Sequence, residues 1–72
     1  MSERSAIELR PAAQSALSDS PIFALRELIV EQADDSLLIR GSVPSYYYKQ
    51  LAQETVRAVA NGVEVVNSIR VR

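Results

Sequence analysis

Hydrophobic residues recur with two different periods along the chain, and each period predicts its own kind of element. From Leu9 to Leu17 the apolar residues follow the i, i+4, i+7, i+8 spacing of one helical face. Pro11 is tolerated only in the first turn of a helix, so this helix is expected to begin near Arg10. Residues 18–21 are expected to end it, because the residue before a proline avoids helical geometry.

Alternation of polar and apolar residues in the middle of the chain predicts a β-hairpin. A first strand is expected at residues 25–32, because the β-branched residues Ile29 and Val30 lie near its centre. Residues 33–36 form the turn, since aspartate tolerates left-handed backbone geometry, and residues 37–42 form the returning strand. The apolar residues that share one face are Leu28, Val30, Leu37, Ile39 and Val43. The opposite face carries Glu27, Ile29, Glu31, Leu38, Arg40 and Ser42.

A second helix and a third strand follow the hairpin. Ser45 is expected to cap the helix, and Asn61 and Gly62 are expected to end it with left-handed geometry. The apolar stripe of this helix, at steps of four, four and three, is Tyr48, Ala52, Val56 and Val59. The third strand covers residues 63–71, and its inner face carries Val65, Asn67, Ile69 and Val71. We expect a structural role for Asn67, because a buried amide must have its hydrogen bonds met.

These elements predict an α+β fold in the order α-β-β-α-β. Two helices packed on one face of a three-stranded mixed sheet would bury the apolar faces and leave the other sheet face open. A chain of 72 residues is enough for one small domain, which we place at residues 9–72. Residues 1–8 are polar and mixed in charge, so we expect them to form a flexible tail.

The composition argues against several kinds of chemistry. The chain has no cysteine and no histidine, which removes disulfides, thiol catalysis, zinc sites of the Cys or His type and histidine-containing triads. Asp34 and Asp35 lie in the predicted turn without the alternating oxygen ligands of a calcium loop. A domain of this size also has little interior in which to shape a catalytic pocket. We therefore expect neither an enzyme nor a bound metal or cofactor.

Charge and hydropathy bear on partners and on location. The net charge is −1 and acidic residues are interleaved with the basic ones, so nucleic acid is not an expected partner. No apolar stretch approaches the ~20 residues of a membrane span, and none forms a signal peptide. The expected location is the cytoplasm if Met1 is the natural start. It is the periplasm or a membrane surface if the chain is a fragment of an exported protein.

Three adjacent tyrosines at the start of the second helix are the main candidates for a contact surface. Successive helix residues point about 100° apart, so Tyr46, Tyr47 and Tyr48 cannot share one buried face. Tyr48 falls at the edge of the apolar stripe. Tyr46 and Tyr47 either pack over the helix start or a neighbouring strand, or form an exposed pair with Lys49. An exposed pair of this kind suits a membrane interface or a protein contact.

The open sheet face is the second candidate surface. Its apolar residues Ile29, Leu38 and Val66 lie among charged residues that include Arg40. This face is either solvated, with weak charge pairs between strands, or a contact surface on which the apolar side chains touch. The candidate contact residues of the two surfaces are Tyr46, Tyr47, Lys49, Ile29, Leu38, Arg40 and Val66.

Motifs in the second half of the chain resemble the BON domain, the bacterial osmotic-shock and nodulation module. Residues 37–45, Leu-x-Ile-x-Gly-x-Val-x-Ser, are similar to the second strand and helix entry of that family. Residues 65–71, Val-x-Asn-x-Ile-x-Val, are similar to its closing strand. The family keeps a basic residue and small or apolar residues at the helix positions that are here Lys49, Ala52, Val56 and Val59. The resemblance covers residues 9–72, but Asp35 stands where the family usually has a turn glycine, and residues 61–62 depart from its usual Gly-Val.

The resemblance implies binding rather than catalysis. BON domains are linked to envelope maintenance, occur as accessory modules in secretins, channels and osmotic-stress proteins, and take part in protein–protein contacts. Phospholipid binding has also been proposed for them. We therefore expect a non-catalytic adaptor module that contacts a protein partner or a second copy of itself. The alternative is a peripheral phospholipid-binding module at a bacterial membrane surface.

Overall fold

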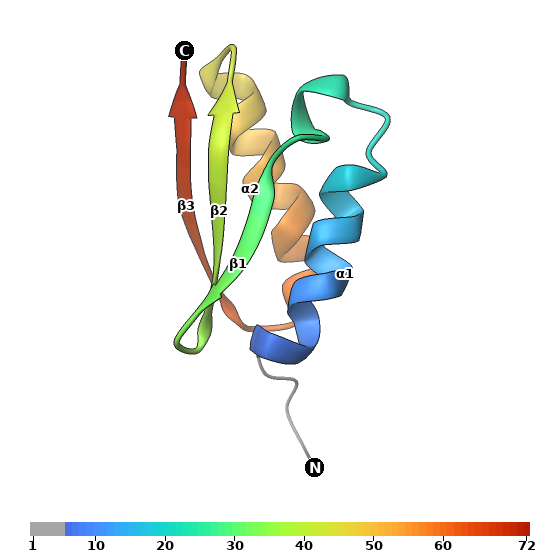
Figure 1. Cartoon of the computed structure of the whole chain (residues 1–72), viewed down its shortest axis with the longest axis vertical. Helices are drawn as coiled ribbons and strands as arrows, with labels where there is room; N and C mark the ends of the chain where they lie inside the picture. The colour runs from blue at the N-terminus through green and yellow to red at the C-terminus, as the bar shows by residue number, and fades with distance from the viewer. Residues whose placement is uncertain (1–5) are drawn as a thin grey trace.

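A computed structural model of the chain describes residues 6–72 and confirms the predicted α+β class (Figure 1). The elements in chain order are helix α1 (Ala6–Ser18), the short 3-10 helix η1 (Phe23–Leu25), strands β1 (Ile29–Ala33) and β2 (Ser36–Val43), helix α2 (Tyr46–Ala60) and strand β3 (Glu64–Val71). Both α-helices pack on the same face of the sheet. Residues 1–5 of the predicted tail lie outside the described part of the chain.

The central strand of the sheet is β2. It pairs antiparallel with β1 through the hairpin turn and parallel with β3, which the chain reaches through α2. Parallel neighbours require such a crossover, and a helix is its usual form. Val30 lies opposite Ile39, and Ile39 lies beside Asn67. The two faces predicted for the sheet are therefore confirmed.

The core lies between the inner face of the sheet and the two α-helices. Its largest fully buried side chains are Leu17, Leu25, Leu28, Leu37, Ile39, Val30, Val43 and Val56. The stripe predicted for α2 faces this core, with Ala52 and Val56 buried and with Tyr48 and Val59 half-buried at its margins. Burial of each large apolar side chain stabilises the fold by about 1.5–3 kcal/mol.

The first helix begins at Ala6, one turn earlier than Pro11 predicts. Ala6 and Leu9 are both buried on the face that also carries Ala13 and Leu17, so the additional turn extends the core. Pro11 lies on the exposed side of the helix together with Ile7, whose carbonyl its missing N–H would otherwise bond. Residues 6–8 thus belong to the domain and not to a tail.

The first strand is shorter than predicted, because Leu25 is the last residue of η1 and Arg26 and Glu27 form a turn. Leu25 N–H donates to Ile22 O at 3.0 Å, and Arg26 Nε donates to Ser20 O at 2.8 Å. Leu25 is fully buried in the core cluster. Its apolar character therefore reflects a place in the core, and β1 begins only at Ile29.

The turn and cap residues largely adopt the geometry that the sequence predicts. Asp34 takes a φ of +55° in the hairpin turn, and Asn61 ends α2 in left-handed geometry at φ 52° and ψ 47°. Ser45 occupies the predicted N-cap position, but its hydroxyl makes no capping hydrogen bond. Gly41 has a φ of +135°, and a Cβ at this position would lie 2.7 Å from Leu28 Cδ2. The backbone geometry therefore favours glycine there, and an added Cβ would also force the Leu28 side chain to shift.

Candidate functional site

The exposed aromatic residues gather where β2 ends and α2 begins. Tyr46 and Tyr47 are each 66% exposed, and Phe23 on the neighbouring η1 is 75% exposed. η1 contacts α2, and Phe23 and Pro44 line the same small surface hollow. Figure 1 shows η1, the start of α2 and the end of β3 at the same end of the domain. We call this end of the domain, with its exposed residues Phe23, Tyr46 and Tyr47, the aromatic end.

The tyrosine triplet divides as the helical geometry predicts. Tyr48 is half-buried and packs against the core, whereas Tyr46 and Tyr47 point into solvent. The ring of Tyr47 meets the ring of Tyr48 edge-on, with centroids 5.3 Å apart and an interplanar angle of 71°. This contact orients Tyr47 while leaving most of its surface exposed. Lys49 is half-buried beside them.

Two arginine side chains lie beside Phe23 at the aromatic end. The Arg26 guanidinium lies 5.6 Å from the centre of the Phe23 ring, within range of a cation–π interaction. Arg72 lines the hollow beside Phe23 and donates a hydrogen bond to the Ser42 hydroxyl at 3.1 Å. Glu27 is the acidic residue at the same hollow. Phe23 was not among the candidates predicted from the sequence, because it falls between the predicted first helix and the predicted first strand.

The open sheet face is less apolar than the sequence alone implies. Leu38 and Val66 are register partners and half-buried, but Ile29 lies diagonally across from Leu38. The Glu31–Arg40 ion pair, at 2.9 Å, occupies the opposite diagonal and separates Ile29 from Leu38. The three apolar residues therefore do not form one continuous strip.

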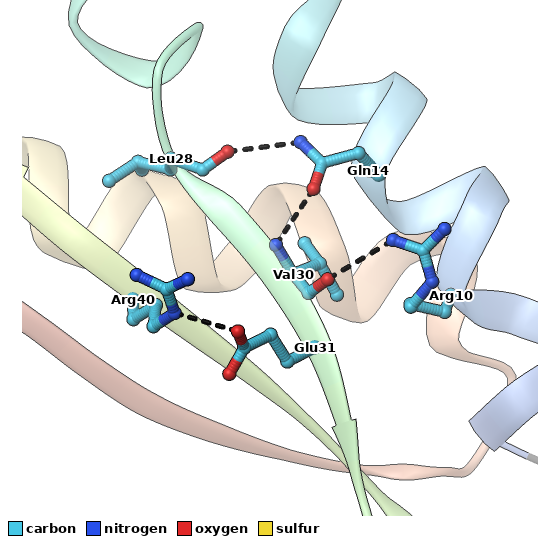
Figure 2. A network of polar contacts seen from close by, with 6 residues as sticks. All are labelled: Arg10, Gln14, Leu28, Val30, Glu31 and Arg40. Atoms are coloured by element: carbon cyan, nitrogen blue, oxygen red, sulfur yellow. Dashed lines mark hydrogen bonds and ion pairs between the residues drawn. The ribbon is translucent and has the colours of Figure 1, made fainter.

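Side chains of α1 cover the free edge of β1 (Figure 2). Gln14 Nε2 donates to Leu28 O at 3.0 Å, and its Oε1 accepts the Val30 N–H at 2.8 Å. Arg10 donates to Val30 O at 3.2 Å. Sequence reasoning missed this role, although Arg10, Gln14 and Ser18 stand four residues apart beside the apolar stripe of α1.

Asn67 ties β3 to α2. Its Nδ2 donates to Lys49 O and to Gln53 Oε1, both at 3.0 Å, and its Oδ1 accepts the Ile69 N–H at 3.1 Å. The predicted structural role is thereby confirmed, and both acceptors of the Asn67 amide group belong to α2. Lys49 consequently takes part in the fold through its backbone.

Residues 6–72 contain neither a metal-binding cluster nor a membrane-spanning helix. No group of three acidic side chains in this part of the chain is placed to hold a metal ion. None of the helices described there has both the length and the apolar character that a membrane crossing requires.

Comparisons with protein-family models, with curated proteins and with solved structures gave no match for this chain. The resemblance to the BON domain therefore stays a prediction drawn from the motifs.

Proposed function

We propose that the chain is a non-catalytic binding module of the BON type that contacts a protein partner through its aromatic end. The observation that carries this proposal is the exposure of Phe23, Tyr46 and Tyr47 on adjoining elements. Aromatic residues and arginine dominate the binding energy of protein interfaces, because they bury large rigid surfaces and still form polar contacts. The neighbouring Arg26 and Arg72 supply that second component.

The aromatic end is a better contact surface than the open sheet face. On the sheet face, the most exposed apolar residue is Ile29 at 39%, and an ion pair separates it from Leu38. At the aromatic end, the three aromatic side chains are exposed by two-thirds or more. The apolar surface available to a partner is therefore concentrated at the aromatic end.

A phospholipid surface is the second candidate partner. Tyrosine rings favour the boundary between head groups and hydrocarbon, and nearby arginines attract anionic lipids by about 1 kcal/mol each. Tyr46 and Tyr47 with Arg26 and Arg72 combine both features. This alternative predicts binding to vesicles that contain anionic lipid.

The protein-partner proposal is tested by site-specific photo-crosslinking in living bacterial cells. A photoreactive phenylalanine analogue replaces Tyr46 or, as matched controls, Glu54 on the exposed side of α2 and Ile29 on the sheet face. We expect a discrete heterologous adduct from position 46 that is absent from both control positions. An adduct from position 29 alone would assign the contact to the sheet face and contradict the proposal.

The lipid alternative is tested by co-sedimentation with vesicles of phosphatidylcholine, with and without phosphatidylglycerol. The wild-type chain is compared with the Tyr46→Ser/Tyr47→Ser variant, and Tyr48→Phe serves as the control that keeps the core contact. Binding that requires both phosphatidylglycerol and the two tyrosines supports the alternative. No sedimentation of the wild-type chain with either vesicle would exclude it.

A further inference from the structure

We propose that the free edge of β3 pairs antiparallel with β3 of a second copy of this chain. This surface is separate from the aromatic end, and the inference goes beyond the proposed function. It rests on the direction of the backbone groups in β3, on the protection given to β1 but not to β3, and on the charges along the strand.

Alternate residues of β3 turn their backbone groups away from the sheet. Arg72 N–H donates to Val43 O at 2.9 Å, which shows that the even-numbered residues bond β2. The Ile69 N–H is accepted by the side chain of Asn67, as expected for an odd-numbered residue that faces outward. The N–H and C=O groups of one strand residue point to the same side, so those of Val65, Asn67 and Val71 also face outward.

The edge of β3 carries few of the features that usually block strand pairing. Its register with β2 runs without a bulge from Glu64 to Val71, and the strand contains no proline. Within residues 6–72 the Ile69 N–H is the single outward backbone group of β3 that a side chain is seen to bond. Val65 is half-buried and Val71 is 39% exposed, so apolar surface accompanies the free edge. In Figure 1 β3 is the outermost strand over its upper part, and the β1–β2 hairpin turn extends past its lower end.

The charges of β3 select a second copy in antiparallel orientation. Pairing centred on Asn67 places Glu64 opposite Arg70 of the second copy, and Val65 opposite its Ile69. The Ile69 N–H would then exchange its bond to Asn67 Oδ1 for one to the Val65 carbonyl of the second copy. The two-fold axis repeats each of these pairs. Glu64 and Arg70 would form a non-hydrogen-bonded pair, in which opposite side chains approach most closely. Parallel pairing would instead place each charge opposite the same charge.

The covered edge of β1 would stop assembly at two copies. The joined sheet would run in the order β1-β2-β3-β3-β2-β1, with β1 at both outer edges. Arg10 and Gln14 already bond the outward groups of Leu28 and Val30. The two-fold dimer is therefore closed, and growth into a longer sheet is blocked.

Sedimentation equilibrium with a charge swap tests this pairing. The single variant Glu64→Arg places arginine opposite arginine at both symmetric positions, and we expect the dimer dissociation constant to rise roughly tenfold. The double variant Glu64→Arg/Arg70→Glu restores opposite charges, so its constant should return to within about twofold of the wild-type value. Glu8→Arg, on the exposed side of α1, is the matched control and should leave association unchanged.

Amide hydrogen exchange supplies a second measurement on the same proteins. At concentrations where the wild-type chain is dimeric, the Val65 and Asn67 N–H groups should be protected, and they should exchange faster in Glu64→Arg. A wild-type chain that remains monomeric at about 1 mM, the weak end of measurable affinities, would overturn the proposal. A dimer that survives Glu64→Arg but is lost in Tyr46→Ser/Tyr47→Ser would overturn it in favour of the aromatic end.

Discussion

The two edge strands of this sheet differ in how far side chains cover their free backbone edges. β1 is short, and Arg10 and Gln14 from α1 bond the outward backbone groups of Val30 and the carbonyl of the preceding Leu28. β3 is longer. Among the described residues, a side chain bonds one outward backbone group of β3, the Ile69 N–H, which donates to the Asn67 side-chain oxygen. Both strands flank the same central strand, so the difference does not follow from the fold type. It depends on which polar side chains the neighbouring helix supplies, and it leaves one edge available for contact.

The largest expected effect comes from Gly41→Ala, which disturbs the packing of β2 against Leu28, next to the covered edge of β1. Alanine at a φ of +135° is strained, and its Cβ would press on Leu28, the residue that leads into β1. We expect the free energy of unfolding to fall by about 2–4 kcal/mol in urea denaturation followed by circular dichroism. Gly62→Ala is the matched control, because a Cβ there meets nothing within 4 Å although its φ is also positive. Equal losses in both variants would show that backbone strain alone decides the effect.

A smaller effect is expected from Gln14→Ala, which removes the main cover of the β1 edge. The Val30 N–H and the Leu28 carbonyl would each lose a partner in a half-buried setting. We expect a loss of about 1–3 kcal/mol in the same urea assay. Gln50→Ala, on the exposed side of α2, should stay within about 0.5 kcal/mol of wild type. If both glutamine variants unfold alike, the cover of β1 contributes nothing to stability.

The smallest effect is expected from Arg10→Met, which keeps the aliphatic stem of the side chain but removes its donor. Val30 O would then be bonded by water, because this part of the edge is only partly buried. The loss of unfolding free energy should be about 0.5–1 kcal/mol. Arg57→Met on α2 provides the comparison for removing a charge without an edge contact. A larger loss for Arg10→Met than for Gln14→Ala would reverse the assigned importance of the two side chains.

Local patterns in the sequence predicted most of the fold. The alternation in β2 and β3 identified both faces of the sheet, and Asn61 marked the end of α2, because these signals depend on immediate neighbours. The start of α1 at Ala6 was missed, since the gain from burying Ala6 and Leu9 outweighs the local preference of Pro11. Propensity is a weak guide where tertiary packing decides the boundary.

The candidate surfaces were predictable only in part. The exposure of Tyr46 and Tyr47 was one of two alternatives, because helical geometry shows that the triplet must split but not where its outer members lie. Phe23 lies at the same end of the domain as the tyrosines because η1 contacts α2. The hydrogen bonds of Gln14 to the edge of β1 are made to residues at least fourteen positions away in the sequence. Contacts of that range cannot be inferred from spacing alone.

Acidic and basic residues are concentrated at opposite ends of the strands. Acidic residues occupy the turn and the neighbouring start of β3, whereas arginines occupy the end where β2 and β3 finish. The acidic set is Asp34, Asp35 and Glu64, and the basic set is Arg26, Arg70 and Arg72; Glu27 at the basic end and Arg57 near Glu64 are the exceptions. β2 spans its eight residues over about 23 Å, which exceeds two Debye lengths at physiological ionic strength. A net charge of −1 therefore conceals an electric dipole, and a partner arriving at the aromatic end meets a positive local potential.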